Sequence, residues 1–165
     1  MKKSVLILFA IVGFAWHSTS QEIAENAIGI RLSENDGFGP EINYQRGLGD
    51  NNRLELGLAF HSHRHHDAVK FTGIYQWVWN IDGGFNWYAG PGAGVGLVSF
   101  DDHHGPGDHD HDGDTDIYAF ATGDIGIEYN FDFPLLVSFD FRPQINFGHP
   151  DDLSFDVGLS ARYQF

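Results

Sequence analysis

The sequence has 165 residues, no cysteine and a net charge of −14, from 9 Lys and Arg against 23 Asp and Glu. The length fits one ordinary domain, and the absence of cysteine excludes disulfides and thiolate metal sites. The negative charge argues against nucleic acid as a partner, because it would repel the phosphate backbone. With 21 Gly, 15 Phe, 6 Tyr and 4 Trp, the composition favours strands and tight turns, so we expect an all-β protein.

The first twenty residues have the order of a secretory signal peptide. Lys2 and Lys3 precede an apolar run from Val5 to Trp16, and small residues follow at positions 18–20. The run is shorter than the roughly 20 residues that a membrane helix needs. We therefore predict a signal peptide over residues 1–20 and a single domain over residues 21–165 with a net charge of −16. An uncleaved anchor is the alternative.

Eight stretches of alternating apolar and polar residues follow, separated by turn signals. They cover residues 27–33, 38–46, 52–62, 68–80, 84–100, 116–130, 134–147 and 153–165. An even number of consecutive antiparallel strands can close on itself and leave no exposed sheet edge. We predict an eight-stranded antiparallel up-and-down β-barrel.

Side-chain volume predicts which face of this barrel points inward. An eight-stranded barrel is just wide enough for its interior to be filled by side chains, so small residues belong inside. In the fifth stretch Gly90, Gly92, Gly94 and Gly96 share the polar face, opposite bulky residues such as Trp87. The pattern therefore indicates a transmembrane barrel with its apolar face toward lipid. A soluble lipocalin-like carrier of an apolar ligand, with that face inside, is the alternative.

The charged residues of the strands support the same orientation. The predicted inner face carries five cations and six anions: Arg31, Arg53, Lys70, Arg142 and Arg162, and Glu41, Glu55, Asp124, Glu128, Asp140 and Asp156. Charges enclosed in a narrow interior must be paired, because an unpaired buried ion costs several kcal/mol. A nearly neutral set meets this requirement.

The connections differ in length between the two ends. Short turns are predicted at residues 47–51, 82–84 and 131–134, and the other connections contain residues 33–37, 62–67, 101–116 and 148–153. Outer-membrane barrels have short periplasmic turns and longer external loops. Aromatic residues of the apolar face gather near the short turns and predict an interfacial girdle: Tyr44, Trp77, Trp79, Trp87, Tyr129, Phe131, Tyr163 and Phe165.

The leader, the eight strands and the final Ala161-Arg162-Tyr163-Gln164-Phe165 resemble the small outer-membrane β-barrel proteins of Gram-negative bacteria, the OmpA/OmpX-type group. The resemblance implies a monomeric integral protein of the bacterial outer membrane, embedded in its lipid, with a plugged interior and its function in the loops. It also implies that the barrel-assembly machinery reads the terminal aromatic residue, which is Phe165 here.

The external connections are rich in histidine and aspartate. The candidate metal ligands are His61, His63, His65, His66, His103, His104, Asp108, His109, Asp110, His111 and Asp112. Imidazole and carboxylate suit Zn²⁺ or Ni²⁺. Residues 108–113 also resemble the start of a Ca²⁺ loop, although Ala119 stands where an EF-hand has its bidentate Glu. No cofactor is required, and solvated loops that bind no metal are the alternative.

We therefore expect a structural or surface-interaction protein, with metal binding as an added hypothesis. A lipid A-modifying barrel enzyme would need a Ser or His near the lipid with an orienting acid. His61 and Ser62 are adjacent, so on a strand they would point to opposite faces. The sequence accordingly favours a protein that is not an enzyme.

Overall fold

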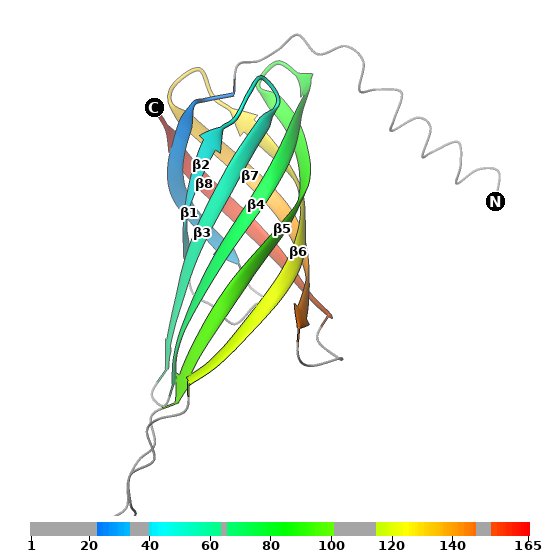
Figure 1. The fold of residues 1–165 in the computed structure, drawn as a ribbon. Coiled ribbons are helices and arrows are strands. Elements are labelled where there is room, and N and C mark those ends of the chain that lie inside the picture. The colour runs from blue at the N-terminus through cyan, green and yellow to red at the C-terminus, as the bar shows by residue number, and fades with distance from the viewer. Residues whose placement is uncertain (1–22, 34–39, 64–65, 101–114, 148–152) are drawn as a thin grey trace, which may run out of the picture.

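The computed structural model describes residues 23–33, 40–63, 66–100, 115–147 and 153–165. The strands are β1 (Asn26–Ser33), β2 (Glu41–Gly47), β3 (Asn52–His63), β4 (His66–Asp82), β5 (Phe85–Phe100), β6 (Thr115–Asn130), β7 (Leu135–Phe147) and β8 (Leu153–Gln164). Each strand pairs antiparallel with the next, and β8 pairs with β1, so that the sheet closes into a barrel (Figure 1). The predicted fold and all eight strands are confirmed, with ends shifted by at most three residues.

Three short turns mark one end of the barrel, here called the turn end, and the opposite end is called the loop end. The turns comprise residues 48–51, 83–84 and 131–134, as predicted. Gly83 has φ +51°, a backbone conformation that favours glycine, and its carbonyl accepts a hydrogen bond from the Asn80 amide at 2.9 Å. The backbone of Asn26 also pairs with Phe165 at this end, where the barrel closes.

The barrel is taller on one side. β4, β5 and β6 have 17, 16 and 16 residues, whereas β1 and β2 have 8 and 7. The longer strands project beyond the others at the loop end, which is the lower end in Figure 1. About 10 residues of a tilted strand cross the hydrocarbon layer, so β4–β6 are longer than a bilayer requires.

One predicted connection is shorter than expected. Residues 62–67 were expected to form a loop, but β3 runs to His63, β4 begins at His66, and these two residues are paired in the ladder. The polar composition of residues 62–67 is the reason why the sequence predicts a loop. The antiparallel ladder nevertheless continues because its hydrogen bonds use only backbone groups.

Inner and outer positions alternate as predicted. The inner glycines leave room for large side chains from neighbouring strands: a Cβ atom at Gly94 would collide with the ring of Phe120, and one at Gly126 would collide with the ring of Tyr88. Tyr88 and Phe120 are 0% and 1% exposed. The volume argument from sequence did not anticipate these two internal rings, which fit because each lies over a glycine.

The polarity of the interior decides between the two barrel types. The described inner face is dominated by charged and polar side chains, whereas large apolar residues such as Phe60, Ile125 and Phe139 are about half exposed on the outside. A carrier of an apolar ligand needs the reverse arrangement. The lipocalin-like alternative is therefore wrong. Within the described ranges, the protein has no α-helix that is long and apolar enough to cross a bilayer.

Candidate functional site

The enclosed interior of the barrel holds the charged residues that the sequence placed there. All eleven are at most 7% exposed: Arg31, Glu41, Arg53, Glu55, Lys70, Asp124, Glu128, Asp140, Arg142, Asp156 and Arg162. They reach one another because alternate residues of a strand share a face and a closed sheet turns those faces toward a common axis. The prediction of an internal ionic set is confirmed.

Glu55 of β3 is the centre of the largest ion cluster. Its Oε1 lies 2.5 Å from Nη2 of Arg142, and its Oε2 lies 3.0 Å from Nη2 of Arg162. The Gln45 amide donates a further hydrogen bond to Oε2 at 2.5 Å. Arg142 also contacts Glu41 at 3.2 Å. One carboxylate therefore joins β3 to β7 and β8, across the barrel axis.

Two further arginines have their own carboxylate partners. Arg31 lies 2.6 Å from both Asp140 and Asp156. Arg53 forms a two-pronged pair with Glu128, at 3.1 Å from Nη1 and 2.7 Å from Nη2. Such bidentate geometry is the stronger kind of charge-assisted hydrogen bond. These pairs connect strands that are distant in sequence and so brace the closed sheet from inside.

Neutral polar residues complete the network, and the sequence reasoning did not single them out. Gln76 accepts a hydrogen bond from Nε of Arg53 at 2.5 Å and donates one to Asp124 at 2.5 Å. Arg162 donates to Asn43 at 3.0 Å and to Ser138 at 2.7 Å. The alternation of inner and outer residues along each strand could have predicted that these neutral side chains point inward. The alternation does not predict their charged hydrogen-bond partners, because these partners depend on contacts between strands around the barrel.

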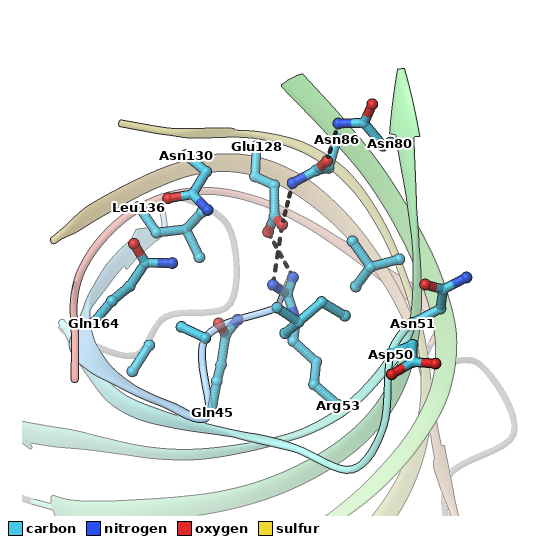
Figure 2. Close-up of a pocket in the computed structure, with 14 residues that line it drawn as sticks. Gln45, Asp50, Asn51, Arg53, Asn80, Asn86, Glu128, Asn130, Leu136 and Gln164 are labelled. Atoms are coloured by element: carbon cyan, nitrogen blue, oxygen red, sulfur yellow. Dashed lines mark hydrogen bonds and ion pairs between the residues drawn. The ribbon is translucent and has the colours of Figure 1, made fainter. Parts of the chain in front are cut away.

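The two cavities described in the interior are small. One, at the turn end, has a volume of about 20 Å³, and the other, toward the loop end, has about 10 Å³. Figure 2 shows the first, where Arg53 meets Glu128 and the amides of Asn86 and Asn80 continue the chain of hydrogen bonds. A water molecule needs roughly 10–15 Å³ of such space. Neither cavity therefore admits a larger solute.

The outer face is an apolar belt. Exposed residues of this belt include Ile30, Ile42, Phe60, Phe71, Val95, Ile125, Phe139 and Leu159, each between 45% and 54% exposed. Soluble proteins rarely expose a continuous apolar surface of this extent. The belt matches the lipid-facing surface of a transmembrane barrel.

Aromatic rings line the turn end of this belt. Trp79 stacks on Trp87 with ring centroids 4.3 Å apart, and Tyr129 contacts Phe85 and Phe131 at 4.6 and 4.7 Å. A further pair, Tyr163 and Phe165, lies at the end of the last strand. Amphipathic rings at one level are typical of a membrane–water interface. The predicted girdle is confirmed, and Phe85 belongs to it as well.

Three solved structures share this arrangement. The N-terminal β-barrel domain of Pseudomonas aeruginosa OprF matches with a TM-score of 0.62 and 12% identity, over 85% of this chain and 96% of that chain. Ail, the attachment invasion locus protein of Yersinia pestis, matches with a TM-score of 0.56 and 15% identity, over 85% and 96%. Neisserial surface protein A matches with a TM-score of 0.58 and 9% identity, over 85% and 94%.

The fold is that of the small eight-stranded outer-membrane barrels. No protein-family model matches the sequence, and the curated proteins give no significant match. At identities of 9–15%, the likeness lies in the arrangement of strands rather than in shared side chains.

Most of the predicted metal ligands belong to segments whose placement the structure does not describe. His65, His103, His104, Asp108, His109, Asp110, His111 and Asp112 fall outside the described residues, as do the side chains of His61, His63 and His66. The described backbone pairs His63 with His66. Among the side chains that the structure does describe, no three His, Asp or Glu residues are grouped to hold a metal ion. Metal binding stays a prediction.

Proposed function

We propose that this protein is an integral, monomeric β-barrel of the bacterial outer membrane that acts at the cell surface and not as a channel or an enzyme. The observation that carries the proposal is the reversed polarity of the barrel, with an apolar belt outside and paired charges inside. Such a surface is stable only where acyl chains cover the belt. The aromatic girdle then lies at the periplasmic interface, and the loop end faces the outside.

A surface role follows from the same geometry. The interior is filled by Arg31, Glu55, Arg142 and their partners, so it offers no path for solutes. Among the described residues, the parts that extend beyond the bilayer at the loop end and can meet a partner are the tall ends of β4–β6. Two proteins of similar fold support this assignment, since one is described as an attachment invasion locus protein and the other as a surface protein.

The membrane assignment can be tested by fluorescence quenching. Apart from Trp16 in the predicted leader, the tryptophans are Trp77, Trp79 and Trp87, all within the turn-end girdle. Refolded protein in vesicles of brominated lipids should show the strongest quenching with bromines near the headgroups. The folded barrel should also migrate differently in electrophoresis before and after heating. Extraction without detergent, together with fluorescence unaffected by brominated lipid, would contradict the proposal.

The closed interior has its own test. Planar bilayers containing the refolded protein should show no steady ion conductance beyond that of protein-free controls. A variant that replaces Glu55 and Arg142 by alanine removes the central contact and serves as the comparison, since it should conduct if the plug is what blocks the lumen. Stable open channels formed by the unmodified protein would refute a closed barrel.

We further propose that the external connections bind a divalent ion. The support is the sequence pattern, in which His103 and His104 follow two aspartates, and His109 and His111 alternate with aspartates over residues 108–112. Zinc, nickel and calcium should each be titrated into the refolded protein and into a variant lacking residues 103–111. Weaker binding by the deletion variant is expected. Equal affinities would remove the longest loop from the proposal, and absence of binding by both proteins would refute it.

Assembly is proposed to depend on the C-terminal aromatic residue. Phe165 is 62% exposed and its backbone is hydrogen-bonded to Asn26, so its ring is available at the closing seam of the barrel. Replacement of Phe165 by alanine should reduce the folded, heat-modifiable fraction in outer membranes while leaving refolding into detergent intact. Equal folded fractions in cells would contradict recognition through Phe165.

A further inference from the structure

One group of polar and charged side chains lies on the outside of the barrel, at the turn end of β1 and β2. Among the outward-facing strand residues that the structure describes, Arg46 is the one cation, and its side chain is 45% exposed. The five cations of the inner face are enclosed in the lumen. Arg46 therefore meets what surrounds the barrel and takes no part in the internal network.

The position of Arg46 along the barrel matches the aromatic girdle. Arg46 is the last outward-facing residue of β2 before the turn, and it pairs with Asn26, the first residue of β1. The next outward residues toward the membrane centre are Tyr44 and Ile28, and Ile28 pairs in turn with Tyr163 of the girdle. Because such a girdle marks the membrane–water interface, Arg46 lies at the level of the lipid headgroups.

Glu25, Asn26, Tyr44 and Arg46 form the outer polar cluster. Nη1 of Arg46 donates a hydrogen bond to Oδ1 of Asn26 at 2.8 Å, and Nη2 lies 2.6 Å from Oε1 of Glu25. The Tyr44 hydroxyl donates to the same Asn26 oxygen at 2.6 Å. The backbone carbonyl of Glu25 accepts a hydrogen bond from Gly47 at 2.9 Å. These contacts fix the guanidinium group and the carboxylate side by side on the outer surface.

Both charged groups retain hydrogen-bonding capacity. A guanidinium group has five N–H donors, and the contacts with Asn26 and Glu25 use two of them. Within the described part of the chain, Oε2 of Glu25 has no partner, and this side chain is 70% exposed. A ligand could therefore bind both Arg46 and Glu25 without separating them.

A zwitterionic headgroup is complementary to this pair. A phosphate accepts parallel hydrogen bonds from a guanidinium group, and a primary ammonium group donates to a carboxylate. Glu25 precedes Asn26, so it lies one residue nearer the periplasm than the pair of Asn26 with Arg46. In phosphatidylethanolamine the phosphate lies between the acyl chains and the ammonium group. The two charges of the lipid thus follow the same order as Arg46 and Glu25.

The surface next to the cluster suits the acyl chains of such a lipid. Toward the loop end, the outer face of β1 and β2 presents Ile28, Ile30 and Ile42, each about half exposed. An acyl chain that extends from a phosphate at Arg46 toward the membrane centre would contact these side chains.

We infer that the outer polar cluster binds the headgroup of one phospholipid of the ethanolamine type, with Arg46 on the phosphate and Glu25 on the ammonium group. The remaining contacts come from the isoleucines of β1 and β2. This inference rests on the proposed insertion into the membrane, since lipid reaches this face only there.

Native mass spectrometry tests the inference by counting the lipid that stays bound. Refolded protein in detergent micelles is mixed with equal amounts of dioleoyl phosphatidylethanolamine and dioleoyl phosphatidylcholine. The choline lipid has the same phosphate but methyl groups in place of the N–H donors, so it cannot donate a hydrogen bond to Glu25. Because exposed ionic contacts are weak, we expect about two- to five-fold more complex with the ethanolamine lipid. Equal retention of the two lipids would overturn the inference.

Variants assign the two contacts separately. Glu25→Gln should abolish the preference between the lipids, and Arg46→Gln should lower the retention of both by about two-fold or more. Arg46→Lys keeps a cation and should retain more lipid than Arg46→Gln. Asp132→Asn, which removes an exposed acid from another turn at the same end, is the matched control and should behave as the unmodified protein. A preference that persists in Glu25→Gln, or equal retention by Arg46→Gln and Asp132→Asn, would refute the site.

The same samples separate this inference from the proposed function. Heat-modifiable migration reports whether each variant has folded, independently of bound lipid. A folded barrel that prefers dioleoyl phosphatidylglycerol, which has the phosphate but no ammonium group, would contradict the role of Glu25 and leave the barrel assignment intact. Failure of the unmodified protein to form a heat-modifiable barrel would count against the proposed function itself.

Discussion

Replacement of Glu55 by glutamine tests whether the internal ion cluster stabilises the barrel. The substitution keeps the shape of the side chain and removes its charge. Arg142 retains Glu41 at 3.2 Å, but Arg162 keeps only neutral partners, because its remaining hydrogen bonds go to Asn43 and serine hydroxyls. One buried guanidinium group is thus left without a carboxylate.

The magnitude follows from the cost of breaking a buried pair. Removing one partner of such a pair costs about 3–5 kcal/mol. The glutamine still accepts one hydrogen bond, so we expect about 3 kcal/mol, a change of more than ~100-fold in the ratio of folded to unfolded protein. Urea unfolding of the refolded barrel, followed by tryptophan fluorescence, measures this loss.

The control and a second variant make the test specific. Asp132→Asn removes an exposed acid and should change the free energy of unfolding by less than about 0.5 kcal/mol. Combining Glu55→Gln with Arg162→Met removes the stranded charge and should recover about 1–3 kcal/mol of the loss. If Glu55→Gln is no more destabilising than Asp132→Asn, the internal pairs do not hold the barrel together.

Two further predictions concern the inner and outer faces. Gly126→Ala should lower the free energy of unfolding by about 1–3 kcal/mol, because the new methyl group meets the ring of Tyr88, whereas Gly73→Ala, with 3.7 Å to its nearest neighbour, should be nearly neutral. The same urea titrations decide this, and equal effects would refute the tight inner packing. Ile125→Arg puts a charge on the lipid face and should cost about 2–4 kcal/mol in vesicles, while Asp132→Arg at a turn should cost less than about 1 kcal/mol. If Ile125→Arg is tolerated as well as Asp132→Arg, that face does not contact acyl chains.

Much of the interior could be read from alternation alone. Residues two apart on a strand share a face, so the inward positions of Arg31, Glu55 and Arg142 followed once the glycine stripe of β5 had been assigned to the inside. The partners of these charges could not be read in the same way. The guanidinium group of Arg142 and the carboxylate of Glu55 are 87 positions apart, and they meet only because the closed sheet brings β3 and β7 to opposite sides of one narrow lumen.

The sequence by itself determined the number of strands, their alternation and the polarity of each face, because these depend on a period of two residues and on local turn signals. Tertiary structure decided where the strands end at His63 and His66, which glycines lie beneath Tyr88 and Phe120, and which residues line the small cavity at the turn end. These features depend on the register between strands and on contacts through the barrel interior. The register and the interior contacts are both set by how the strands pair, and strand pairing produces no periodic pattern in the amino-acid sequence.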